Sequence, residues 1–116
     1  MILVDTSVWV DHLRNGNKEL GKLLNEEEVA CHPFIIGELA CGNLKNRKEI
    51  LALLQSLPLY DVVDHHELLS FIDSANLVGK GIGFIDAHIL ACARMNSAPL
   101  WTLDKKLQRE ASRLQI

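Results

Sequence analysis

Length, composition and charge exclude several classes of protein. The chain has 116 residues, 48% of them hydrophobic and 23% charged, which predicts one domain over residues 1–116 and excludes a two-domain, fibrous or disordered protein. Twelve Lys and Arg against fifteen Asp and Glu give a formal net charge of −3, which argues against a uniformly basic surface for nucleic acid. Aromatic residues make up only 5%, so a platform of interleaved base-stacking side chains is not expected.

The cysteines and the apolar segments indicate the cellular compartment of the protein. Cys31, Cys41 and Cys92 form no close pair, which fits neither a disulfide framework nor a zinc motif and indicates buried thiols in a reducing cytoplasm. The opening M-I-L-V-D has no basic leader, so no signal peptide is expected. No stretch approaches about 18 apolar residues, the length of a membrane helix. We therefore expect a cytoplasmic protein without a membrane partner.

Short apolar strands alternate with helices along the chain. Strands are predicted at residues 2–4, 29–31, 59–63 and 99–102, because unbroken apolar runs are typical of buried parallel strands. Capping residues and helical spacing predict helices that follow caps at Thr6 or Ser7, Asn17, Asp64 (running to Leu77) and Asp104, and another after the glycines of G-K-G-I-G. Two more helices are predicted, one with Pro33 at its first position and one over residues 47–57. This order predicts an α/β fold whose mainly parallel sheet has helices on both faces and binds ligands at the carboxyl ends of its strands.

Four acidic residues stand alone in apolar segments. Asp5 directly follows the first strand, and Asp104 follows the last. Glu38 is the only formal charge between residues 29 and 43, and Asp86 is the only carboxylate between residues 81 and 93. Burying a lone carboxylate costs several kcal/mol unless it is paired, caps a helix or binds a metal. Asp5 and Asp104 also fit helix caps, and Asp86 fits the positive end of a helix dipole.

Glu38 fits a purely structural role poorly, because it lies in the middle of a helix that we expect to be largely buried. If the fold brings the four acids together, each pair at about 5.5 Å repels by roughly 3 kcal/mol at an effective dielectric of 20. Only a cation makes such a cluster favourable. An all-oxygen set of ligands favours Mg²⁺ or Mn²⁺ over zinc and indicates a metal-dependent nuclease or phosphatase.

Setting the four acids aside leaves eleven acidic against twelve basic residues. The acidity therefore belongs to the predicted site, and basic residues elsewhere are available to follow a phosphate backbone. The candidates for this role are Lys18, Lys22, Lys45, Arg47, Lys48, Lys80, Arg94, Lys105 and Lys106.

The chain resembles the PIN-domain ribonucleases, and within them the VapC-like toxins of bacterial and archaeal toxin-antitoxin pairs. The motifs I-L-V-D-T-S-V-W, G-E-L-A-C-G, I-G-F-I-D-A-H-I-L-A-C-A and P-L-W-T-L-D-K-K-L carry this resemblance, which covers the whole chain. It implies a PIN-like three-layer sandwich with a short, mainly parallel sheet of four to five strands. It also implies an Mg²⁺- or Mn²⁺-dependent endoribonuclease, a phosphodiesterase that acts as the toxin of such a pair.

The resemblance assigns residues to the site. The acidic quartet is Asp5, Glu38, Asp86 and Asp104. Asp5, Asp86 and Asp104 would hold the metal, Glu38 would complete the cage and orient the attacking water, and Thr6 and Thr102 would order carboxylates or metal waters. His88 stands where such proteins often carry an aliphatic residue, so we expect it to pack rather than to bind metal.

Two protein partners are expected. Trp9, Leu13, Leu20 and Leu24 lie on neighbouring predicted helices, and apolar surface left over from one small core predicts a homodimer. The resemblance implies a cognate antitoxin. A basic or amphipathic segment of that antitoxin would cover the acidic pocket, because a cluster of carboxylates attracts an Arg or Lys side chain.

Two other functions remain open at this stage. One is a catalytically weak PIN-fold protein that binds or processes RNA. The other is a receiver-like phosphoacceptor domain, which has a similar size but needs a mid-chain aspartate at a strand end. Here the mid-chain acid is Glu38, inside a helix, and Asp104 stands where such domains have lysine. A dehalogenase-type phosphatase is disfavoured, since Ser7 occupies the position of its second aspartate.

Overall fold

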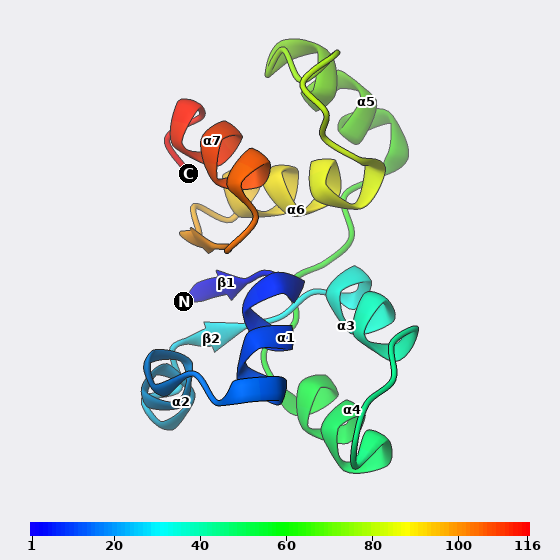
Figure 1. Cartoon of the computed structure of the whole chain (residues 1–116). Helices are drawn as coiled ribbons and strands as arrows, with labels where there is room; N and C mark the ends of the chain where they lie inside the picture. The colour runs from blue at the N-terminus through cyan, green and yellow to red at the C-terminus, as the bar shows by residue number, and fades with distance from the viewer.

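A small parallel sheet is the middle layer of the structure (Figure 1), a computed structural model that describes residues 1–116. Helices α1 to α4 lie on one side of it and α5 to α7 on the other. The elements in chain order are β1 (Ile2–Val4), α1 (Thr6–Asn15), α2 (Lys18–Asn25), β2 (Val29–Ala30), α3 (Pro33–Ala40), α4 (Arg47–Ser56), α5 (His65–Ser74), α6 (Phe84–Met95), β3 (Leu100–Trp101) and α7 (Lys105–Arg113). The predicted α/β class is thus confirmed.

The first strand is the centre of the sheet. The strand order is β2-β1-β3, and both pairings are parallel, with Leu3 opposite Ala30 on one side and Leu100 on the other. Leu3 and Val4 are completely buried, as an unbroken apolar run predicts for a strand covered on both faces. Because all three strands run the same way, their carboxyl ends meet at one edge, where the residues that follow β1 and β3 are brought together.

The prediction of four to five strands is wrong, because residues 59–63 do not form a strand. Only Leu59 pairs with the sheet, in a single parallel bridge to Cys31. The Cys31 amide donates to the Pro58 carbonyl at 2.8 Å, and the Tyr60 amide donates to the Cys31 carbonyl at 3.0 Å. Proline has no amide hydrogen to extend this ladder, and the chain leaves the edge after these two bonds. The sheet therefore has three strands.

Two helix ends differ from their predictions. The cap of α1 is Asp5 rather than Thr6 or Ser7, since the Asp5 carboxylate accepts a hydrogen bond from the Ser7 amide. Helix α5 ends at Ser74 and does not reach Leu77. Asn76 has a left-handed φ of 54°, which ends the helix and turns the chain back. The caps predicted at Asn17 and Asp64, and the proline at the first position of α3, are confirmed.

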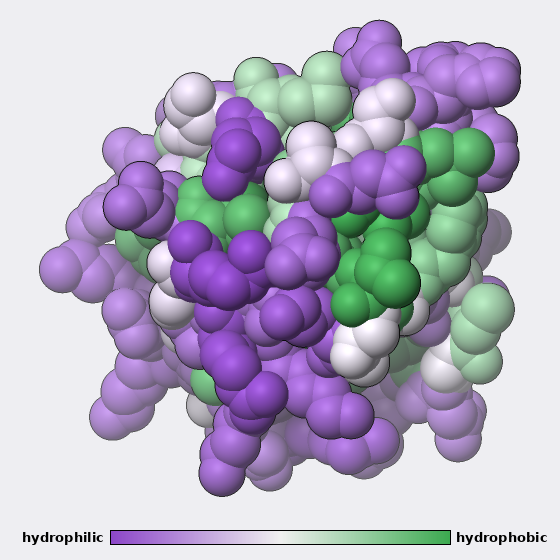
Figure 2. All heavy atoms as spheres, turned by 90° about the horizontal axis from the view of Figure 1, so that it is seen from above, coloured by the Kyte–Doolittle hydropathy of each residue, from purple (hydrophilic) through white to green (hydrophobic).

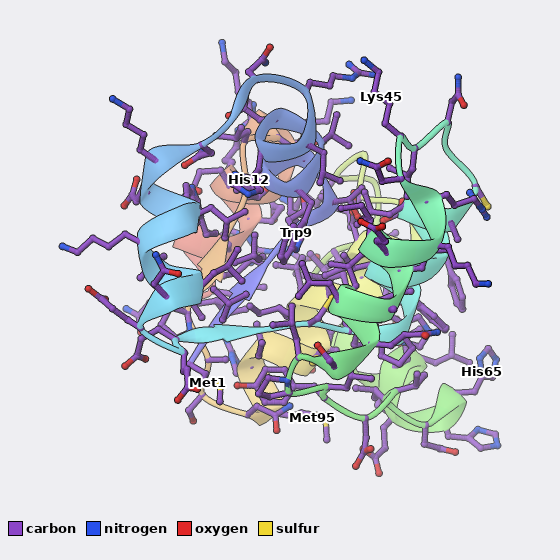
Figure 3. The ribbon with its side chains drawn as sticks, turned by 90° about the horizontal axis from the view of Figure 1, so that it is seen from below. Met1, Trp9, His12, Lys45, His65 and Met95 are labelled. Atoms are coloured by element: carbon purple, nitrogen blue, oxygen red, sulfur yellow. The ribbon has the colours of Figure 1, made fainter.

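Several residues that sequence patterning marked as apolar surface belong to the core. Trp9 is 1% exposed and Leu20 is fully buried, and Figure 3 shows Trp9 in the interior. These two side chains therefore do not contribute to a dimer face.

Two of the three cysteines are buried, as predicted, and the third is not. Burial raises the pKa of the Cys31 thiol to about 11 and that of the Cys92 thiol to about 11 as well. Cys41 is exposed, so the prediction of a buried thiol is wrong at this position.

None of the helices combines the length and the apolar character needed to cross a membrane.

Candidate active site

Asp5 is held at the carboxyl end of the central strand by three hydrogen bonds. It is 5% exposed, and its Oδ2 accepts from the Ser7 hydroxyl at 2.8 Å, the Thr102 hydroxyl at 2.8 Å and the Ser7 amide at 3.4 Å. All three bonds reach the same oxygen, which leaves Oδ1 free. The side chain is thus fixed in direction while one carboxylate oxygen stays available.

Ser7 and Thr102 join the ends of β1 and β3 into one network. Their hydroxyl oxygens lie 3.2 Å apart, the Leu103 amide donates to the Ser7 hydroxyl at 2.9 Å, and the Asp104 amide donates to the Thr102 hydroxyl at 3.0 Å. Thr102 was expected near the site. Sequence reasoning assigned no site role to Ser7 beyond a helix cap; the signal that marks it is a hydroxyl two residues after a strand-end aspartate, where side-chain turns are common.

Asp104 caps α7 and faces the same edge of the sheet. Its Oδ1 accepts from the Lys106 amide at 2.9 Å and from the Leu107 amide at 3.1 Å. The structural alternative proposed for Asp104, a helix cap, is therefore real. It does not use the whole carboxylate, because Oδ2 makes no protein hydrogen bond. The same holds for Asp5, which caps α1 with one oxygen only.

Glu38 lies on the exposed face of α3, so the expectation of a buried charge in a largely buried helix is wrong. The neighbouring apolar side chains, Ile35 and Leu39, are buried, and the helix presents Gly37 and Glu38 to solvent. The Thr6 hydroxyl, from the first turn of α1, donates to Glu38 Oε1 at 2.7 Å. This bond turns the Glu38 carboxylate toward the start of α1 and hence toward Asp5.

Asp86 stands out because it makes no hydrogen bond to the protein. It is half-buried at the third residue of α6. Its pKa is raised to about 6 by burial and, in decreasing order, by the negative charges of Asp5, Asp104 and Glu38. The pKa of Asp86 therefore responds to all three other acids of the predicted quartet. Both its oxygens are open to a ligand.

No basic residue neutralises this acidic group. The two salt bridges of the protein, Lys22 to Glu26 and Arg113 to Glu110, lie elsewhere. The acids are not packed to ligand distance, since no three His, Cys, Asp or Glu side chains lie close enough to hold an ion among them directly. Mg²⁺ commonly takes only one or two protein carboxylates and keeps several waters. The arrangement fits this mode of binding.

A groove opens beside Glu38. It has a volume of about 490 Å³ and lies between α1, α3, α4 and the α3–α4 loop. Its apolar wall is formed by Val10, Leu13, Leu39, Leu44 and Ile50. Arg14 and Lys45 stand at its rim without an acidic partner, and Figure 3 shows Lys45 extending outward from the loop. Thr6 and Glu38 line both the groove and the acidic site.

His88 is packed among aromatic rings, as expected. It is 3% exposed, and its ring lies edge-to-face between those of Phe34 and Phe84, at centroid distances of 4.8 and 4.7 Å. Burial lowers its pKa, with a further contribution from His65. The neutral ring thus serves as a spacer between two phenyl groups.

Comparison with known proteins agrees with this geometry. The family model described as "PIN domain" matches residues 2–112. Ribonuclease VapC32 of Mycobacterium tuberculosis, in strains CDC 1551 / Oshkosh and ATCC 25618 / H37Rv, is 46% identical over 109 residues, which are 93% of this chain and 88% of the relative. A receiver-like domain is thereby excluded, and the resemblance noted from the sequence motifs is confirmed. The chain belongs to the PIN domain family.

Proposed function

We propose that this protein is a metal-dependent endoribonuclease and the toxin of a toxin-antitoxin pair, acting in the cytoplasm. The observation that carries the proposal is Asp86, a half-buried carboxylate that makes no protein hydrogen bond. Its pKa is raised by burial and then by the charges of Asp5, Asp104 and Glu38. Like charges converging without a counter-ion are unfavourable unless the site binds a cation. The similarity to a ribonuclease over 93% of the chain supports RNA as the substrate.

The donor set fits Mg²⁺ or Mn²⁺. All four side chains offer carboxylate oxygens, which these hard cations prefer. Asp5 and Asp104 each have one oxygen held by the protein and one free, the arrangement by which neighbouring groups orient metal ligands. We assign Asp5, Asp86 and Asp104 as the residues that would hold the ion. When bound, such an ion lowers the pKa of its water and offsets charge on the reacting phosphate.

The side chains of this protein supply orientation and proton handling. Ser7 and Thr102 hold Asp5 in one direction, so that its free oxygen faces the site. Thr6 holds Glu38 by Oε1, which leaves Oε2 to accept a hydrogen bond from the attacking water. No Ser, Cys or Lys nucleophile is needed, because water attacks the phosphodiester and the 3′ or 5′ oxygen departs.

The decisive experiment compares purified wild type with Asp86→Asn and Asp5→Asn on total RNA and on short single-stranded oligonucleotides. We expect cleavage with MgCl₂ or MnCl₂, loss of cleavage with EDTA, and at least a 100-fold loss in each variant with the fold intact by circular dichroism. Sequencing the RNA ends identifies the cleaved bonds. If the wild type binds RNA but leaves it uncut with either metal, the protein is instead a binding or processing factor of the PIN fold.

The groove beside Glu38 suits an inhibitory partner. An apolar helix of a cognate antitoxin would lie against Val10, Leu13 and Leu39, with acidic residues facing Arg14 and Lys45. A single Arg or Lys of that segment would reach the carboxylates of Glu38 and Asp86 and compete with metal. The partner would thus block both RNA and cation with one helix.

Co-expression tests the antitoxin proposal. Expression of the wild type alone should arrest growth, and co-expression with the neighbouring reading frame should restore it and yield a complex. The variant Leu13→Asp should stay toxic but escape rescue. Harmless expression of folded, metal-binding wild type, with no protein retained in a pull-down, would contradict the proposal.

A homodimer remains part of the proposal, on a smaller apolar face than the sequence indicated. Leu24 is half-buried, while Trp9 and Leu20 are in the core and Leu13 lines the groove assigned to the antitoxin. Light scattering at tens of micromolar should give twice the 13.0 kDa monomer mass. A mass of one chain would end this proposal without affecting the others.

A further inference from the structure

Phe84 is the only exposed side chain among the phenylalanines, tryptophans and tyrosine of the protein. It is 55% exposed, whereas Trp9 is buried and the other four aromatic residues, Phe34, Tyr60, Phe71 and Trp101, are partly buried. An exposed phenylalanine does not contribute the free energy of burial that an aromatic side chain supplies in a core, and this chain has few aromatic residues. A single exposed ring is not a platform for several bases, but it is sufficient for one.

The Phe84 ring is held in place from behind. It meets the buried ring of His88 at 4.7 Å and an interplanar angle of 82°, and His88 meets Phe34 on α3 at 4.8 Å and 82°. Phe34 in turn contacts His32, whose ring is completely buried, at 5.2 Å. This chain of contacts anchors the exposed ring to the core, so that it loses little side-chain entropy when a flat ligand stacks on it.

The ring belongs to the same first turn of helix α6 as an acid of the candidate site. Phe84 and Asp86 are the first and third residues of α6. Side chains two apart on a helix leave it on different sides, so Phe84 flanks the acids rather than joining them. A base that stacks there would belong to a nucleotide next to the one whose phosphate meets Asp86.

Two lysines lie at the loop that leads to Phe84. The end of the Lys106 side chain packs against Gly81, so closely that its Nζ would lie 3.4 Å from a β-carbon added to that glycine. The start of α7 therefore lies against the loop that leads to Phe84. Lys80 is exposed in the same loop, and neither lysine makes a salt bridge. An aromatic ring with unpaired cations around it is the chemistry that binds single-stranded nucleic acid.

We propose that Phe84 is a positioning residue for RNA, on which one base adjacent to the scissile phosphate stacks, while Lys106 contacts the phosphate of that nucleotide. This inference rests on the proposed ribonuclease function and adds a subsite to it. Stacking on a phenyl face does not read hydrogen-bonding edges, so this subsite selects for an unpaired base rather than for one base type. It therefore favours single-stranded RNA over duplex.

A protein partner is the competing occupant of this surface. Figure 2 shows apolar side chains in patches toward the side of the molecule where Figure 1 places α5 and the start of α6. The exposed apolar residues of these elements and their loop include Leu69, Val78 and Phe84. A protein interface would use the whole patch, whereas stacking uses only the aromatic ring. Val78, 69% exposed and not aromatic, is thus the matched control.

The test measures kcat and KM on a 12-nucleotide single-stranded RNA that contains a mapped cleavage site. Phe84→Ala should raise KM about 5- to 150-fold, the range found for removing one stacking partner, and leave kcat within about twofold. Phe84→Trp should retain the wild-type KM. Phe84→Leu should resemble Phe84→Ala, because it keeps apolar surface and loses the π face. Val78→Ala should match the wild type.

A second measurement uses RNA that lacks one base. In the wild type, an abasic site at one position beside the cleaved bond should raise KM as much as Phe84→Ala does, and in Phe84→Ala the abasic site should have no further effect. Equal KM for Phe84→Ala and Val78→Ala, or a change of oligomeric mass in Phe84→Ala with KM unchanged, overturns the stacking proposal alone. Absence of cleavage by the wild type overturns the ribonuclease proposal instead.

Discussion

The hydroxyl of Thr102 donates a hydrogen bond of 2.8 Å to Asp5 Oδ2 across 97 residues of sequence. Both residues follow strands of the parallel sheet and both are 5% exposed. The bond therefore fixes the candidate catalytic aspartate against the opposite end of the chain. It also gives the hydrogen of the Thr102 hydroxyl an acceptor, while the hydroxyl oxygen accepts from the Asp104 amide.

Removal of this hydroxyl should weaken both the fold and the site. We expect Thr102→Val to lower the free energy of unfolding by about 1–2 kcal/mol, because Asp5 loses a buried donor. The metal concentration for half-maximal cleavage should rise by about 10- to 100-fold, as for other groups that orient metal ligands. Urea unfolding and an Mg²⁺ titration measure the two effects. Thr102→Ser keeps the hydroxyl and should behave like the wild type in the titration.

Metal should stabilise the wild type more than its Asp86→Asn variant. The folded state raises the pKa of Asp86 to about 6, above the value of about 3.9 in an unfolded chain. In metal-free protein this group lowers the free energy of unfolding as pH rises from about 4 to 6. Metal-free Asp86→Asn should therefore have the higher melting temperature at pH 7.

Thermal melts with and without 10 mM MgCl₂ check this expectation, with the exposed Asp73→Asn as the control for removing a carboxylate elsewhere. Wild type and Asp73→Asn should gain stability with Mg²⁺ by mass action, and Asp86→Asn should gain less. Equal gains in all three proteins would place the bound cation away from Asp86.

Removal of the Thr6 hydroxyl should lower kcat without abolishing cleavage. Thr6→Val keeps the side-chain volume and removes the 2.7 Å bond to Glu38, so the Glu38 carboxylate loses its fixed direction. We expect kcat to fall by about 10-fold, within the range for such orienting groups. Thr6→Ser should restore most of the activity. An unchanged kcat in Thr6→Val would show that Glu38 needs no partner.

His32 should make the protein sensitive to acid. Its ring is completely buried, and burial, together with the nearby His88, lowers its pKa to about 4. The unfolded chain binds a proton near pH 6.5 and the folded chain does not, so stability is full above about 6.5 and falls as pH decreases toward 4. The loss at pH 5 should be about 2 kcal/mol by this linkage.

The variant His32→Asn isolates this effect. Nδ1 of His32 accepts a hydrogen bond from the Phe34 amide at 2.9 Å and caps α3, and asparagine caps helices without titrating in this range. Its free energy of unfolding should change less between pH 7 and pH 5 than that of the wild type. The exposed His66→Asn is the control for the chemical change. A parallel decline in all three proteins would assign the acid sensitivity elsewhere.

Much of the site was predictable from isolated charges. Asp5, Asp86 and Asp104 stand out because apolar sequence surrounds them, and the rule that parallel strands end at one edge brings Asp5 and Asp104 together. Glu38 was selected for a wrong reason. Composition does not reveal which side of a short helix faces solvent, and Glu38 is exposed. What connects Glu38 to the candidate site is its hydrogen bond with Thr6, a contact between distant parts of the chain.

The parts that sequence patterning missed depend on contacts between distant segments. Ser7 has the ordinary sequence context of a helix start, and its bond to the Leu103 amide follows only from the approach of β3. The segment 59–63 has strand-like composition, but a single bridge is all that the sheet edge provides after Pro58. Trp9 and Leu20 have helical spacing that fits either a core or an interface. Only packing decides between them.

The central position of β1 has a consequence for how the protein is made. The ribosome synthesises Ile2–Val4 nearly a hundred residues before its neighbour on one side, Leu100–Trp101. Until that segment has emerged, β1 is an unpaired edge, and Asp5 lacks Thr102 and Asp104. Contacts so distant in sequence form late in folding. A chain still being synthesised therefore lacks the assembled acidic group, and the candidate site forms only once residues 100–104 have emerged.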